Sequence, residues 1–174
     1  GRLTNWKGQI VFIEALNILN QQTYVKPFSA IILGSDQGRS VYYKKLLSLV
    51  EKYRLNQKIQ FIPFCKEMPL AYKLADVVVS ASIEPEAFGR VSVEAQSMEK
   101  PIVASEIGGS RETIMKNKSG LLFKSGDPIS LAEKLKEILS LDENATKLMG
   151  IEGRKNVLKK FDVEKMCNST ITEY

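Results

Sequence analysis

The sequence has no histidine, only two cysteines and no long apolar run. Without histidine it lacks the commonest general base and metal ligand, so its chemistry must use carboxylates, cations, backbone dipoles or a group supplied from elsewhere. Cys65 and Cys167 show neither metal-ligand nor disulfide spacing, which suits a reducing cytoplasm. No apolar stretch approaches the roughly 20 residues that a membrane-spanning helix needs. We therefore expect a cytoplasmic location.

The composition is that of an ordinary folded protein with a small excess of positive charge. The 174 residues are 44% apolar and 26% charged, which suits one domain with a full hydrophobic core. Much of the lysine excess behind the net charge of +5 lies in helical stretches, where solvated surface is the ordinary interpretation. Attraction to an anionic substrate or membrane face is the alternative. No basic tract is interleaved with aromatic residues, so we expect no nucleic-acid partner.

Short β-branched runs alternate with longer helical patterns along the chain. The expected strands cover residues 28–34, 58–64, 76–82, 101–105 and 120–123, the third being apolar enough for burial on both faces. The expected helices cover residues 9–21, 39–54 and 68–75, start at 89 and at 127, and run from 142 to the end with a break near 161. This alternation predicts an α/β fold with an open, doubly wound parallel sheet. Ligands of such sheets bind beyond the carboxyl ends of the strands, which directs attention to the loops there.

The opening stretch "GRLTNWKG" has the pattern of a loop that leads from a strand into a helix. A strand should precede Gly1, and the sequence does not contain it. We therefore expect residues 1–174 to form one domain that lacks its first strand and belongs to a longer protein.

The stretch "EAFGRV" has the features of a phosphate site. If a helix begins at Gly89, the free amides of Gly89, Arg90 and Val91 lie at the positive end of its dipole, where phosphate binds readily. Glu94 follows about 7.5 Å further along the axis and could accept both hydroxyls of a ribose. Glu86 lies on the other side of the phosphate site. Sugar, diphosphate and ribose in this order make up a nucleotide-sugar, and the stretch offers a partner for each.

Each of these residues also has an ordinary structural interpretation. Glu94 and Arg90 could simply form an ion pair across one helical turn, which contributes only about 0.3–0.5 kcal/mol. Phe88 could be a core residue. Arg2 and Lys7 could offset the charge of a diphosphate leaving group without a metal, but cations before a helix are common.

Two nucleotide-binding motifs and one metal-binding motif do not fit. The stretch "GSDQGRS" lacks the glycine pattern of a dehydrogenase, is one residue short of a P-loop and has Arg39 where that loop needs lysine. No Asp-x-Asp pair follows a strand, so we expect no metal ion.

Four stretches together resemble the carboxyl-terminal half of a group 1 glycosyltransferase of the retaining GT-B superfamily. They are "GRLTNWKG", "IILGSDQG", "EPEAFGRVSVEA" and "PIVASEIGGSRETI…GLLF", in this order, and they cover nearly the whole chain. The spacing of Glu86 and Glu94 matches the Glu-x7-Glu signature of that family. The resemblance implies a Rossmann-like half of a GT-B fold and a nucleoside-diphosphate sugar as substrate, with no cofactor.

The resemblance also implies a role for individual residues. Arg2 and Lys7 would bind the donor diphosphate, Glu86 the hydroxyls of the donor sugar, and Glu94 the ribose. The implied catalytic residues are Arg2, Lys7 and Glu86. The implied donor-binding residues are Gly34, Phe64, Phe88, Gly89, Arg90, Val91 and Glu94. Pro63, Ala81 and Lys100 depart from the family pattern. Because Pro63 lies by the expected base site, the nucleotide stays open.

The resemblance places the acceptor site in an amino-terminal domain that this chain lacks, so the chain alone would transfer little. The acceptor would be a lipid-linked molecule or a polysaccharide, as in lipopolysaccharide or other cell-envelope synthesis, with peripheral contact to the inner face of the membrane. Two alternatives stay open: a nucleotide-sugar epimerase of the same fold, and a noncatalytic module that binds nucleotide-sugars.

Overall fold

The computed structural model describes residues 1–23, 26–162, 167 and 171–172. Its strands are β1 (Ala30–Leu33), β2 (Ile59–Ile62), β3 (Val78–Ser80), β4 (Ile102–Ser105) and β5 (Gly120–Phe123). Its α-helices are α1 (Gln9–Gln21), α2 (Ser40–Lys52), α3 (Met68–Leu74), α4 (Arg90–Ser97), α5 (Ser110–Thr113), α6 (Pro128–Ser140) and α7 (Glu143–Lys160), and a 3-10 turn covers Asn5–Lys7. Most of the tail that we expected to be helical beyond residue 162 lies outside the described residues.

Helices form where the sequence carries both a periodic apolar face and a suitable start. In α6 the carboxylate of Asp127 accepts hydrogen bonds from the amides of Ile129 and Ser130, and Pro128 occupies the first turn. These two features cap the helix and confirm the predicted start. The buried face of α6, with that of α1, covers one side of the larger core; in α6 it consists of Leu131, Ala132, Leu135 and Ile138.

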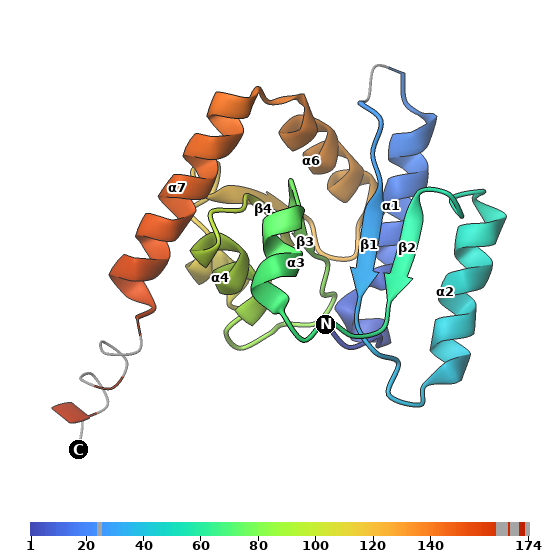
Figure 1. Ribbon diagram of the computed structural model, residues 1–174, viewed down its shortest axis with the longest axis horizontal. Helices are drawn as coiled ribbons and strands as arrows, with labels where there is room; N and C mark the ends of the chain where they lie inside the picture. The colour runs from blue at the N-terminus through green and yellow to red at the C-terminus, as the bar shows by residue number, and fades with distance from the viewer. Residues whose placement is uncertain (24–25, 163–166, 168–170, 173–174) are drawn as a thin grey trace.

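The strands pair in parallel throughout the described chain, as the α/β prediction requires (Figure 1). They form two hydrogen-bonded sheets with the orders β1-β2 and β3-β4-β5. The N-terminal segment connects the carboxyl ends of both. Leu3 N–H donates to Ser35 O after β1 at 3.0 Å, and Ile83 N–H after β3 donates to Trp6 O at 2.8 Å. Figure 1 accordingly shows the N-terminus between the two sheets.

The three-stranded sheet holds the most deeply buried strands. Every residue of β4 and β5 is buried, whereas Val78 and Val79 of β3 are only partly buried. The expectation of a strand buried on both faces therefore holds for β4 rather than for β3. A second, smaller core cluster fills the space between this sheet, α3 and α4; it contains Tyr72, Ala95, Ile102, Ala104, Ile114 and Leu122.

Helix α7 packs closely against α4 near the end of the described chain (Figure 1). A Cβ atom on Gly150 would lie 2.0 Å from the backbone oxygen of Glu99, so only glycine permits this approach. Arg154 of α7 donates a hydrogen bond to Ser97 O at the end of α4. Within the described residues, no helix combines the length and the apolar character needed to cross a membrane.

Candidate functional site

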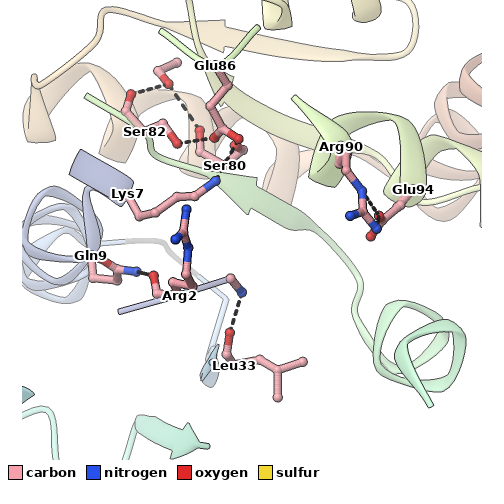
Figure 2. Close-up of polar contacts among 11 residues, drawn as sticks. Arg2, Lys7, Gln9, Leu33, Ser80, Ser82, Glu86, Arg90 and Glu94 are labelled. Carbon is pink, nitrogen blue, oxygen red and sulfur yellow. Dashed lines mark hydrogen bonds and ion pairs between the residues drawn. The ribbon is translucent and has the colours of Figure 1, made fainter. Parts of the chain in front are cut away.

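The loop after β3 holds the most buried ion pair of the candidate site. Lys7 Nζ lies 2.7 Å from Glu86 Oε2, and the two side chains are 17% and 20% exposed. Ser82 Oγ donates to the other carboxylate oxygen at 2.5 Å (Figure 2). Burial by itself would raise the pKa of Glu86, but the bonds from Lys7 and Ser82 outweigh it and hold this pKa below 4.5. Glu86 is thus fixed in its ionised form.

A glycine contact places Lys7 at this position. The 3-10 turn Asn5–Lys7 ends at Gly8, which has a φ of 69° and also caps α1. A Cβ atom at Gly8 would lie 1.8 Å from Ala81 O, one residue past β3. The backbone of Gly8 therefore touches the carboxyl end of β3, and this contact brings Lys7 beside Ser82 and Glu86.

Trp6 organises both predicted cations. The ammonium of Lys7 lies 4.5 Å from the centre of the Trp6 ring, and Cζ of Arg2 lies 5.7 Å from it. These are cation–π distances, so Trp6 does more than fill space. Figure 2 shows Arg2 and Lys7 projecting from the N-terminal segment on the side of Glu86. The segment thus presents two positive charges beside one carboxylate.

Helix α4 begins at Gly89, as predicted. Gly89 is the N-cap residue with a φ of 75°, a left-handed conformation that favours glycine. Among the described residues, no side chain caps the helix at this residue. Arg90 and Val91 form the first turn, so their amides lie at the positive end of the helix dipole.

The carboxylate of Glu94 has partners on both oxygens. Oε1 accepts from Arg90 Nε at 3.1 Å and Nη2 at 2.9 Å (Figure 2), and Oε2 accepts from the hydroxyl of Tyr72 at 2.8 Å. The ordinary ion pair between Arg90 and Glu94 therefore does form. It is a surface pair, because Arg90 is 84% exposed and Glu94 35% exposed. Tyr72, by contrast, is buried, and burial together with the Glu94 carboxylate raises the pKa of its hydroxyl.

Glu86 and Glu94 thus have different direct partners, Lys7 and Ser82 for the first and Arg90 and Tyr72 for the second. Beside Glu86 lies an open cavity of about 500 Å³; it is lined by Pro85, Glu86, Ala87, Gly108, Gly109, Arg111 and Glu112.

Among the described residues, three that were predicted to bind the donor form no hydrogen bond or ion pair with the charged residues Arg2, Lys7 and Glu86, and each has other surroundings. A Cβ atom at Gly34 would lie 1.6 Å from Gly1 O, so the N-terminal segment itself requires this glycine. Phe64 is 75% exposed in the loop between β2 and α3. Phe88 is 45% exposed and contacts the ring of Phe161 edge to face, with 5.5 Å between centroids. The interpretation of Phe88 as a core residue is wrong, because its loop keeps it at the surface beside the end of α7.

Sequence reasoning missed the residues that hold the two acids. Ser82 fixes Glu86, and Tyr72 fixes Glu94. Ser82 could have been noticed four positions before Glu86 in the same loop, whereas the stretch that contains Tyr72 predicted only a short helix. The turn at Gly108–Gly109 supports the same loop, because Gly109 N–H donates to Glu86 O at 2.8 Å. Over the described ranges, no cluster of three or more histidine, cysteine, aspartate or glutamate side chains could hold a metal ion.

Comparison with known proteins identifies a family that matches most of the chain. Residues 1–156 match the family described as glycosyl transferases group 1. The D-inositol 3-phosphate glycosyltransferase of Corynebacterium urealyticum is 34% identical over 148 residues, which are 82% of this chain and 34% of that protein. The chain therefore spans about a third of the length of this relative.

Two solved structures share the fold. One is the Anabaena protein Alr3699/HepE, crystallised with UDP and glucose. Its superposition covers the whole of this chain and 47% of the Anabaena chain, with a TM-score of 0.89 and 28% identity. The carboxyl-terminal domain of the group 1 glycosyltransferase LpcC from Francisella tularensis superposes on 94% of this chain and 84% of its own, with a TM-score of 0.82 and 28% identity.

Proposed function

The chain belongs to the group 1 glycosyltransferases, and we propose that it is the donor-binding half of an enzyme that moves a sugar from a nucleoside-diphosphate sugar to an acceptor. The observation that carries this proposal is the ion pair between Lys7 of the N-terminal segment and Glu86 on the loop that leads into the amino end of α4. Structures of the Anabaena relative, solved with UDP-glucose and with UDP, support a donor of this class.

The site offers a chemical partner for each part of such a donor. The amides at the start of α4 would bind the diphosphate, with Arg2 and Lys7 supplying positive charge. Lys7 can do this while paired with Glu86, because an ammonium has three donors and the ion pair uses one of them. Glu86 would bind the sugar, for which the cavity beside it has about 500 Å³. Glu94 would bind the ribose.

We propose that transfer retains the configuration of the sugar and needs no metal ion. Two fixed cations and a helix amino end can stabilise the charge of the departing nucleoside diphosphate through preorganised electrostatics. This is the role for which a divalent cation is otherwise used. Transfer by the intact enzyme in a chelator such as EDTA tests the second part: a loss of activity that added Mg²⁺ or Mn²⁺ restores would contradict it.

The whole enzyme would contain a further domain with the acceptor site, since this chain covers 47% of the Anabaena relative. We propose that a strand of the intact protein also lies between the two sheets. Within the described residues, β1 pairs only with β2, and β3 pairs only with β4. One edge of β1 and one edge of β3 are therefore without a partner strand among these residues. The sugar acceptor would be lipid-linked or a polysaccharide, with the enzyme in the cytoplasm or peripheral on the inner membrane face.

Calorimetry or ligand-observed NMR with UDP, GDP and ADP tests donor binding. We expect the parent chain to bind at least one of them, and Glu94→Ala and Lys7→Ala to weaken that binding about tenfold or more, because each removes a charged contact. Lys116→Ala is the matched control, since its ion pair with Glu106 is exposed and lies outside the site. If the parent binds none of the three nucleotides, the proposal is wrong.

A further inference from the structure

Tyr72 is the more buried of the two residues that hold the carboxylate of Glu94. Tyr72 is 8% exposed and donates to Glu94 Oε2 at 2.8 Å. The other partner, Arg90, is 84% exposed. An exposed pair one helical turn apart is weak and exchanges readily with water or with a ligand. A hydrogen bond from a buried hydroxyl to a charged group is stronger.

The ring of Tyr72 is packed against α4 and the three-stranded sheet. It belongs to the smaller core cluster, with Ala95 of α4, Ile102 of β4 and Leu122 of β5. Glu94 and Ala95 are adjacent in α4, so the same contacts fix the ring and the helix that carries the carboxylate. The Tyr72 hydroxyl therefore determines how the Glu94 carboxylate is oriented.

We propose that Tyr72 is a positioning residue that orients Glu94 for the two hydroxyls of the donor ribose. The inference rests on the proposed function. With Oε2 held by Tyr72, Glu94 Oε1 becomes available when Arg90 moves from it, and Oε2 retains a lone pair beyond the one that accepts from Tyr72. A ribose diol needs two acceptor positions of fixed orientation, which a freely rotating carboxylate would not present without an entropic cost. Arg90, once released, adds positive charge at the amino end of α4.

Tyr72 also connects two parts of the donor site. It lies on α3, which directly follows the loop of Phe64 and Cys65 where the base is expected. A hydrogen bond from α3 to α4 thus links the base side of the site to the ribose carboxylate. The ribose-specific part of donor affinity should therefore depend on this single hydroxyl.

The test compares two ligands on the same protein sample. The probes are whichever of UDP, GDP and ADP binds tightest, and its 2′,3′-dideoxy analogue, which cannot use Glu94. We expect Tyr72→Phe to weaken binding of the nucleotide about five- to tenfold, because one hydrogen bond to a charged group is lost. Binding of the dideoxy analogue should not change. The ratio of the two dissociation constants does not depend on the folded fraction, so partial unfolding of the variant cannot imitate the result.

Tyr42→Phe is the matched control. The Tyr42 hydroxyl is partly buried and donates to Gln9 Oε1 at 3.1 Å, away from α4, so the ratio should keep its parent value. In the double variant Tyr72→Phe with Glu94→Gln, no loss should appear beyond that of Glu94→Gln alone. A Tyr72→Phe protein with the parental ratio overturns the inference while leaving nucleotide binding intact. A parent chain that binds none of the nucleotides overturns the proposed function and this inference together.

Discussion

Lys7 and Glu86 form an ion pair of 2.7 Å although 79 positions separate them in the sequence. The pair joins the N-terminal segment to the loop that leads into α4, and Ser82 holds the second oxygen of the same carboxylate. The N-terminal segment and the loop before α4 are therefore fixed to one another before any ligand binds. Preorganisation of this kind lowers the cost of binding, because the charged groups do not have to be ordered by the ligand.

Removing the ammonium should destabilise the fold as well as weaken donor binding. Lys7→Met leaves a largely buried carboxylate without its main partner, so we expect the free energy of unfolding to fall by about 1–3 kcal/mol. Lys116→Met removes the exposed ion pair with Glu106, whose side chains are 58% and 41% exposed. It should change the free energy of unfolding by less than about 0.5 kcal/mol. Urea denaturation of both variants measures the difference. Equal losses would show that the Lys7 pair contributes no more than a surface pair.

The lowered pKa of Glu86 predicts a dependence of stability on pH. A carboxyl whose pKa is lower in the folded state than in the unfolded state stabilises the fold above the unfolded pKa. That contribution is lost as the pH falls from near 4.5 through the lowered value. The difference in unfolding free energy between the parent and Glu86→Gln should therefore be constant at neutral pH and shrink toward acid. Denaturation curves from about pH 7 to about pH 3 give this difference. A difference that stays constant over the whole range would contradict the shift.

The sequence predicted what local patterns determine. The predicted helix over residues 9–21 and the start at Asp127 agree with α1 and α6, because periodicity and capping act within a few residues. The start of α4 at Gly89 was predicted for the same reason. The helix expected over residues 39–54 is shorter at both ends, as Ser40–Lys52, since frayed ends carry little sequence signal.

Contacts between distant segments could not be predicted in the same way. Nothing in the stretch "MPLAYKLA" shows that Tyr72 points its hydroxyl at Glu94, 22 positions later. The pairing of Lys7 with Glu86 depends likewise on the packing of Gly8 against the end of β3. Phe88 was misassigned because aromatic residues are usually buried, whereas here it stays 45% exposed beside the ring of Phe161 at the end of α7. The family resemblance supplied the set of site residues, but not the side chains that hold them in place.

The Gly108–Gly109 turn should not tolerate a side chain, because it lies very close to the backbone of the loop before α4 (residues 81–89). A Cβ atom at Gly108 would lie 2.5 Å from Glu86 O, and the residue has a φ of 52°. Gly38 is the matched control, since its φ is 82° but a Cβ atom there would meet nothing within 4 Å. We expect Gly38→Ala to cost about 1–2 kcal/mol for the left-handed backbone.

Gly108→Ala should cost about 1–3 kcal/mol more than that, from the clash with Glu86. Thermal denaturation and nucleotide titration of both variants give the two readouts. Only Gly108→Ala should also weaken nucleotide binding, because it displaces the backbone of Glu86. Similar stabilities for the two variants would show that the loop moves freely away from the turn.

The contact between Phe88 and Phe161 joins the loop before α4 to the end of α7. The rings meet at 76° with 5.5 Å between centroids, and Phe161 is the last residue of the cap that ends α7. Phe161→Ala removes an aromatic pair worth about 0.5–1.5 kcal/mol. If part of that energy holds the loop in its binding conformation, the nucleotide dissociation constant should rise about two- to fivefold.

Tyr43→Ala is the control for this last prediction. Tyr43 and Phe61 form a similar edge-to-face pair, 5.4 Å apart at 85°, but they join α2 to β2. Losing that pair should lower the melting temperature while leaving nucleotide affinity within about twofold of the parent, since the pair lies between α2 and β2. Calorimetric titration of the two variants separates a local support from general stability. The support role is refuted if both variants weaken nucleotide binding to the same extent, because α7 would then act only through the stability of the whole fold.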